Sequence, residues 1–170
     1  MYFFLSGFTS KVAGTEVGVV EPQTTFSACF GAAFLPLHPT KYAELLGKKL
    51  HEKKHINVWL LNTGYVGGAY GTGKRMSLPH TRSLITSVLS GRMSGVEFET
   101  HPIFGLAMPK SCDGVPSEIL NPVNTWADKN AYYAKAKDLA VQFNKNFEKY
   151  ADHASDEIKS AAPKVGEVHI

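Results

Sequence analysis

Apolar residues recur every three or four positions in three stretches of the chain, a period typical of helices with one buried face. The first predicted helix begins at Pro39 or Thr40, and its inward positions are Tyr42, Leu45, Leu46, Lys49 and Leu50. The second runs from about Pro79 to Leu89, with inward Leu84, Ile85, Val88 and Leu89. The C-terminal helix, 128–150, is the longest, and one of its faces carries Tyr133, Ala136, Ala140, Phe143, Phe147 and Tyr150.

Shorter apolar stretches predict strands. Ile56–Leu61 is a continuous apolar run, the pattern of a strand buried on both faces. Val96–Thr100 alternates between apolar and polar residues as a half-buried strand does. Met1–Phe8 is apolar and aromatic, and is too short for its period to decide between a buried strand and a helix. Helices mixed with short strands in this order favour an α/β or mixed α+β fold.

The chain has 170 residues, which predicts one domain or a piece of a larger one. Its 44% hydrophobic and 19% charged residues supply a core and exclude wholesale disorder. A free N-terminus is usually polar and frayed, whereas this chain opens on aromatic residues that favour burial. We therefore expect a single partial domain, 1–170, cut from a longer protein.

Charge and cysteine content narrow the function classes. The net charge of +3 comes from scattered lysines, so we expect no nucleic-acid partner. No stretch reaches the ~20 apolar residues of a membrane helix, and we expect no membrane partner. Cys29 and Cys112 are too few for a disulfide framework, which predicts reduced thiols in the cytoplasm.

Two patterns suggest ligand sites at first sight. Gly68–Lys74 has the glycine and lysine spacing of a phosphate-binding P-loop, but Arg75 stands where that motif needs Ser or Thr for Mg²⁺. Either this is a plain flexible loop, or its basic end touches a nucleotide in another way. His51 and His55 have the i, i+4 spacing of zinc ligands, but no third ligand is evident, so we interpret them as solvated helix residues and predict no metal site.

Several long sequence runs occur together in a fixed order. In the N-terminal half these runs are Tyr2–Glu16, Pro22–Phe34 and Leu37–Ala43. They are followed by Asn62-Thr-Gly64, Gly71–Arg75, Thr81-Arg82, Leu120-Asn-Pro122 and Thr125-Trp126. In sequence and in order these runs resemble the ATP-dependent phosphoenolpyruvate carboxykinases, and the resemblance covers nearly the whole chain. It is to the C-terminal third of that enzyme, which implies a portion of its C-terminal nucleotide-binding domain.

The resemblance implies a reaction. The family converts oxaloacetate and ATP to phosphoenolpyruvate, ADP and CO₂ in gluconeogenesis, with Mn²⁺ on the enolate that decarboxylation leaves and Mg²⁺ on the nucleotide. Its P-loop, metal ligands and catalytic residues belong to upstream sequence, so this chain is expected to supply no catalytic residue and to need the N-terminal part of the enzyme as its partner. The alternative is a non-catalytic truncated or interaction module derived from the same fold.

Site residues follow from the same resemblance. The family's adenosine-contacting positions fall on Arg75, Met76 and Thr81, within a loop at 64–81. A planar Arg75 guanidinium can stack on a purine, and Met76 can pack against it. Thr81 can present its hydroxyl or backbone to the edge of the base, or cap the second helix, and the two roles are compatible.

The family's mobile lid corresponds to residues 14–25. Gly14, Thr15, Glu16 and Gly18 belong to it, and this composition of glycines and few large apolar residues suits a segment that closes over a nucleotide and excludes water. An ordered surface loop is the alternative.

Overall fold

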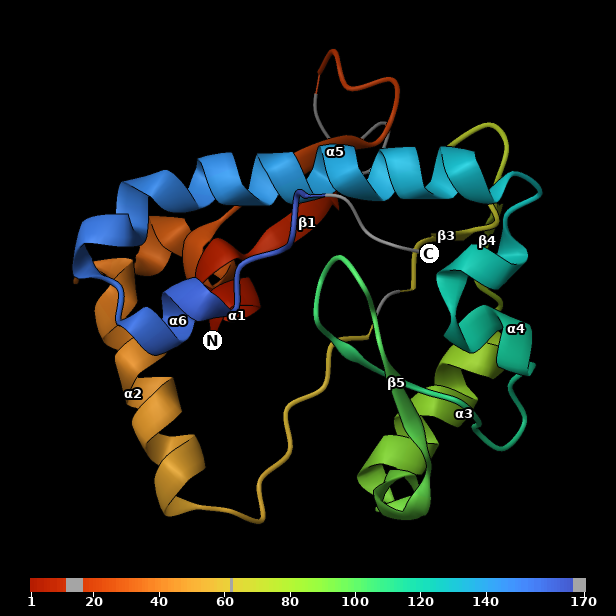
Figure 1. Ribbon diagram of the computed structural model, residues 1–170, viewed down its shortest axis with the longest axis horizontal. Helices are drawn as coiled ribbons and strands as arrows, with labels where there is room; N and C mark the ends of the chain where they lie inside the picture. The colour runs from red at the N-terminus through yellow and green to blue at the C-terminus, as the bar shows by residue number, and fades with distance from the viewer. Residues whose placement is uncertain (12–16, 62, 167–170) are drawn as a thin grey trace. The chain divides into compact units, whose positions relative to one another are not determined.

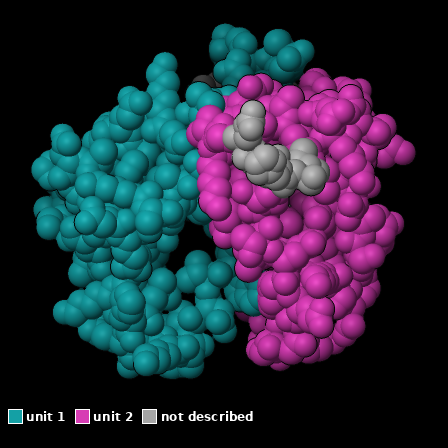
Figure 2. Space-filling model, viewed as in Figure 1, with its two compact units in different colours: residues 1–60, 141–163 teal, residues 61–140, 164–170 magenta. Residues whose placement is uncertain are grey.

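The computed structural model describes residues 1–11, 17–61 and 63–166. The chain divides into two compact units, shown in Figure 2: unit 1 is Met1–Leu60 with Val141–Pro163, and unit 2 is Leu61–Ala140 with Lys164–Ile170. Helices alternate with three two-stranded antiparallel ribbons among these residues, a mixed α/β composition that confirms the expected fold class.

Unit 1 opens with a short helix and a strand ribbon. Helix α1 (Tyr2–Ser6) ends at Gly7, and strand β1 (Phe8–Lys11) pairs antiparallel with β2 (Gln23–Phe26). Gly7 has a φ of +59°, and a Cβ there would collide with the carbonyl of Ser27. Only glycine therefore allows the helix to turn directly into the ribbon at this close backbone approach.

Two 3-10 turns, Ala28–Phe30 and Ala32–Phe34, lead into α2 (Pro39–Glu52). The predicted first helix is present, but its inward face differs. Ala43 and Gly47 are buried, while Leu45 is exposed and Lys49 lies on the surface. Gly47 is covered by the Met1 side chain, so the small residues of this helix, and not its leucines, lie at the tightest contact.

The core of unit 1 is aromatic. Tyr2 stacks on Phe147 of α5 (Lys129–Phe147) with ring centroids 4.6 Å apart, and Phe3, Phe8 and Phe26 surround Phe143. The Tyr2 hydroxyl donates to Asn144 Oδ1 at 3.1 Å, and burial raises the pKa of Tyr2 to about 12. The start of the chain is therefore tied to the second half of α5, as its apolar opening predicts.

The 3-10 segment Glu148–His153 and α6 (Asp156–Ser160) follow α5 in the chain and complete unit 1. Tyr150 and Ile158 are buried, and the predicted helix over 128–150 corresponds closely to α5 with the first turn of this segment. Ser155 caps α6 by accepting a hydrogen bond from the Ile158 backbone N–H at 3.4 Å.

One prediction is wrong. Residues Ile56–Leu61 form no strand and follow α2 as an extended trace without regular structure in Figure 1. Their side chains are exposed, with Val58 at 60% and Leu60 at 54%. A strand buried on both faces needs a neighbour on each edge, and none of the three ribbons in the described parts of the chain includes this run.

Unit 2 contains two ribbons. β3 (Tyr65–Val66) pairs with β4 (Lys74–Arg75), and β5 (Phe98–Thr100) pairs with β6 (Ala107–Pro109). Helix α3 (Leu78–Leu89) and the 3-10 turn Arg92–Gly95 lie between the ribbons in sequence. A short α4 (Ser117–Leu120) and the 3-10 turn Pro122–Thr125, here η4, precede α5.

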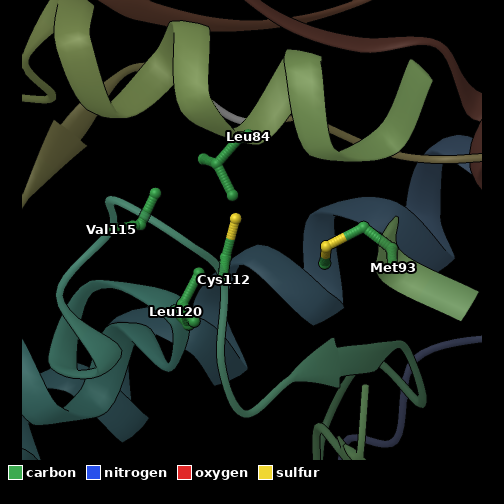
Figure 3. Packing of buried hydrophobic residues seen from close by; sticks show 5 residues of the cluster. All are labelled: Leu84, Met93, Cys112, Val115 and Leu120. Carbon is green, nitrogen blue, oxygen red and sulfur yellow. The ribbon is translucent and has the colours of Figure 1, made fainter. Parts of the chain in front are cut away.

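A small core joins α3 to the segment after β6. Leu84, Met93, Cys112, Val115 and Leu120 are buried together, and Figure 3 shows Leu84 pointing at the sulfur of Cys112. Met76 and Ile119 pack against this cluster from its border. On α3 itself Leu84 is buried as predicted, but Ile85 and Leu89 are exposed because the small Ser87 takes the inward position.

A second core in unit 2 contains a buried histidine. His101 is surrounded by Ile103 and Tyr132, and its Nδ1 accepts two hydrogen bonds, from the backbone N–H groups of Ile103 and Phe104, both at 3.2 Å. Since Nδ1 accepts, the ring proton resides on Nε2, which donates to the Tyr132 hydroxyl at 2.7 Å. Burial lowers the pKa of His101 and raises that of Tyr132 to about 12.

The His101 environment predicts acid sensitivity. The folded state holds the imidazole neutral, while an unfolded chain protonates it below about pH 6.5, so the free energy of unfolding falls as the pH drops through that value. Urea unfolding at pH 7.5 and pH 5.5 measures this loss, and His101→Gln is expected to reduce it. His55→Gln, at an exposed position, is the matched control. An equal pH dependence in the wild type and His101→Gln would contradict the assignment.

Candidate functional site

The glycine-rich segment is the connection of a hairpin. Tyr65 pairs with Arg75 and Val66 pairs with Lys74, and the loop 67–73 joins the two strands. A P-loop links a strand to a helix, whereas this loop returns into an antiparallel strand, and α3 begins only at Leu78. The structure thus agrees with the rejection of a P-loop at Gly68–Lys74.

Close backbone contacts fix the path of this hairpin. Gly67 has a φ of +80°, and a Cβ there would lie 2.9 Å from the carbonyl oxygen of Thr125 in η4. A Cβ on Gly73 would collide with the carbonyl of Gly68 across the loop. The hairpin therefore packs on η4 at one glycine and closes on itself at another, without side chains in between.

A pocket of about 430 Å³ lies beside the hairpin, within the range of small-molecule sites. Three segments of unit 2 line it: the hairpin and its continuation to Ser77, the first turn of α3 with His80, and the α4–η4 segment with Ile119 and Thr125. Met76 and Ile119 form the apolar wall of the pocket. Both pack against the buried cluster of Leu84, Met93, Cys112, Val115 and Leu120.

The polar wall of this pocket is basic. Lys74, Arg75 and His80 line it, and no carboxylate does among the residues that the structure describes. Within the same described ranges, neither Lys74 nor Arg75 forms an ion pair. Two uncompensated cations beside an apolar wall suit a ligand that combines negative charge with a flat apolar part.

The sequence-predicted residues are only partly brought together. Arg75 and Met76 line the pocket, but Thr81 does not. The Thr81 hydroxyl donates to the Ser77 carbonyl at 3.2 Å, one turn back along α3. Ser77, and not Thr81, caps the helix, because its Oγ accepts from the His80 backbone N–H at 3.4 Å.

His80 is an ionisable lining residue that the sequence analysis did not single out. The predicted helix start at Pro79 left no reason to single out the residue that follows it. Ser77 before Leu78-Pro79 is the signal that could have found it, since Ser is a preferred N-cap and Pro is favoured in the first turn. That cap places His80 in the first turn, next to the hairpin.

The predicted lid falls partly outside the described residues, which do not include Gly14, Thr15 and Glu16. The C-terminal end of the segment, residues 23–25, belongs to strand β2, which pairs with β1, so this part is strand and not loop. Gly18 is described, with a φ of +86°, and a Cβ there would have no atom within 4 Å.

Other chemistry-bearing residues stand apart. Among residues 1–11, 17–61 and 63–166, no three His, Cys, Asp or Glu side chains gather as metal ligands do. His51 and His55 are exposed, as predicted, but only His51 lies on a helix, because α2 ends at Glu52. Cys29 and Cys112 are free thiols, and burial raises the pKa of Cys29. No helix in the described chain has the length and apolarity needed to cross a bilayer.

Comparison with known proteins supplies the family context. Residues 1–118 match the sequence model of the family described as phosphoenolpyruvate carboxykinase. Curated relatives named phosphoenolpyruvate carboxykinase (ATP) include those of Christiangramia forsetii, 59% identical over 162 residues, and Flavobacterium johnsoniae, 58% identical over 162 residues. A relative from Caldanaerobacter subterraneus is 57% identical over 164 residues. These matches cover 95–96% of this chain but 30–31% of the relatives, so the chain spans about 30% of their length.

The closed hairpin gives a testable result. Gly73→Ala must open the loop, because the added Cβ meets backbone and not a movable side chain. We expect faster trypsin cleavage after Lys74 and Arg75, and a loss of about 1–3 kcal/mol in the free energy of unfolding. Gly95→Ala, where a Cβ meets no atom within 4 Å, is the control and should leave both measurements unchanged. Equal cleavage rates in the two variants would show that the contact does not hold the hairpin.

Proposed function

The chain belongs to the family of ATP-dependent phosphoenolpyruvate carboxykinases, and we propose that it is the part of such an enzyme that binds the adenosine of ATP. The complete enzyme would convert oxaloacetate and ATP to phosphoenolpyruvate, ADP and CO₂ in the cytoplasm. The observation that carries the proposal is a pocket lined by Arg75, Met76 and further basic residues, with no carboxylate among the described residues of its lining. The curated relatives are named phosphoenolpyruvate carboxykinase (ATP).

The pocket chemistry supports adenosine as the ligand. The guanidinium of Arg75 can lie flat on a purine, a contact worth about 0.5–2 kcal/mol. Met76 and Ile119 offer apolar surface. Both pack against the buried cluster of Leu84, Met93, Cys112, Val115 and Leu120, so the base would meet a preformed wall. Thr81 lies outside the pocket lining, so it would touch the edge of the base only if the ligand extends past that lining. Its hydroxyl already donates its proton to the Ser77 carbonyl, which leaves the hydroxyl oxygen as an acceptor.

The residues that the structure describes do not fit the divalent metals of the reaction. The described residues contain no group of three or more candidate ligands, and the pocket lining has no carboxylate among them. We therefore propose that Mn²⁺ and Mg²⁺, together with the catalytic residues and most of the oxaloacetate site, belong to the rest of the enzyme, which makes up about 70% of the relatives' length. The 170 residues alone should not turn over oxaloacetate.

Arg75 is the residue on which the proposal is tested. In the full-length enzyme that contains this segment, Arg75→Ala should weaken ATP binding by about 1–2 kcal/mol, the size of a lost stacking contact, with less effect on the KM for oxaloacetate. Isothermal titration with ATP and steady-state kinetics provide the two measurements. Arg92→Ala, an arginine outside the pocket lining, is the matched control. Unchanged ATP affinity in Arg75→Ala would remove the basis of the proposal.

We also propose that residues 14–25 act as a lid. In the described part of this segment Val17 and Val20 are exposed, at 107% and 78%, so side-chain contacts hold these two residues weakly. Val19 is buried and residues 23–25 pair with β1, which anchors the C-terminal end of the segment. Hydrogen exchange on the full-length enzyme should show increased protection of residues 17–22 when ATP is added, while the β5–β6 ribbon stays unchanged as an internal reference. Identical exchange of residues 17–22 with and without ATP would favour an ordered surface loop.

A further inference from the structure

We infer that His80 is a nucleotide-binding residue whose imidazole hydrogen-bonds to the sugar hydroxyls of ATP. The inference rests on the proposed adenosine site and adds to it a residue outside the positions Arg75, Met76 and Thr81. Three observations carry it: the place of His80 in the pocket wall, the unused hydrogen-bonding capacity of its ring, and the charge of the groups beside it.

The backbone of His80 is fixed at the pocket. It is the third residue of α3, its N–H donates to the Ser77 cap, and Pro79 precedes it. Ser77 and Arg75 belong to the same short connection between β4 and α3, and both line the pocket together with His80. The cap therefore couples the position of the imidazole to that of the guanidinium.

The ring of His80 is available to a ligand. Within the described ranges its two nitrogens have no hydrogen-bond partner, ion pair or ring contact, although the residue is half-buried. His101 in the same unit shows the opposite case: Nδ1 accepts two backbone N–H groups, and Nε2 donates to Tyr132. A buried histidine that serves packing has its nitrogens satisfied, whereas the half-buried ring of His80 has no protein partner within the described ranges and can take one from a ligand.

The neighbouring groups favour a sugar contact for this ring. The guanidinium of Arg75 suits the face of the base, and the ammonium of Lys74 is a point charge that suits phosphate. A neutral imidazole offers one donor and one acceptor, and each ribose hydroxyl offers the same pair. Nucleotide sites often use a carboxylate for these hydroxyls, and none lines this pocket among the described residues.

The test compares ATP with 2′-deoxy-ATP and 3′-deoxy-ATP in the full-length enzyme. His80→Ala should weaken ATP binding about three- to tenfold, the effect of one neutral hydrogen bond. At least one deoxy analogue should lose a similar factor on the wild type and lose nothing further on His80→Ala, because the variant has already lost that contact. His80→Asn keeps a donor and an acceptor and should recover part of the ATP affinity. His55→Ala, at an exposed position outside the pocket lining, is the control.

The outcomes separate this inference from the proposed function. If His80→Ala binds ATP like the wild type while Arg75→Ala binds it more weakly, the His80 contact is refuted and the adenosine site stands. If neither variant changes ATP affinity, the adenosine site itself is refuted. If His80→Ala weakens ATP and both deoxy analogues by the same factor, the ring does not contact the sugar. Equal melting temperatures of wild type and His80→Ala exclude misfolding as the cause of a weaker affinity.

Discussion

The candidate site depends on a close approach between backbones. Gly67 lies against the carbonyl of Thr125, and Gly73 lies against that of Gly68, so the hairpin is held by main-chain contact at both ends of its loop. Main-chain contacts leave less freedom than contacts between long side chains, because neither partner has rotamers to exchange. The strand β4 that leaves this hairpin carries Arg75 directly into the pocket wall. Any residue larger than glycine at these positions would move the cation that the site requires.

The packing of the apolar pocket wall on the core of unit 2 is a second constraint. Met76 and Ile119 are half-buried and pack against the buried cluster of Leu84, Met93, Cys112, Val115 and Leu120. Full burial of a Leu, Met or Val side chain contributes about 1.5–3 kcal/mol, so the apolar wall rests on the same burial energy that joins α3 to the segment after β6. The basic groups, in contrast, have no partners in the described structure and keep their charge for a ligand. Met76 thus serves both the core and the pocket wall, while the neighbouring Arg75 side chain forms no ion pair within the described structure.

The sequence predicted the helices well and their buried faces less well. Period alone identifies α2, α3 and α5, since apolar residues at three- and four-residue spacing occur in no other common structure. The faces shifted where small residues make the closest contact: Gly47 under Met1 in α2, and Ser87 in α3. Hydrophobic patterns give weight to large apolar residues, and a contact that needs a small residue is invisible to them. The strand predicted at Ile56–Leu61 is absent for another reason. Its pattern is that of a strand with a neighbouring strand on each edge, and the described residues provide no such neighbour.

The site residues show the same division between local and non-local information. Arg75 and Met76 were found by resemblance and lie in the pocket wall, but the wall also needs Ile119 and Thr125, which are more than forty residues away in sequence. No spacing rule connects these segments, because their meeting depends on how η4 receives Gly67. His80 was within reach of local reasoning. A serine followed by a residue and a proline indicates that Ser77 is the N-cap and that the helix begins at Leu78, which places position 80 in the first turn, where the N-terminal end of α3 adjoins Arg75. A helix that begins at Pro79, one residue later, also places position 80 in its first turn, so the missing information was the cap at Ser77 and the adjoining hairpin, and not the boundary itself.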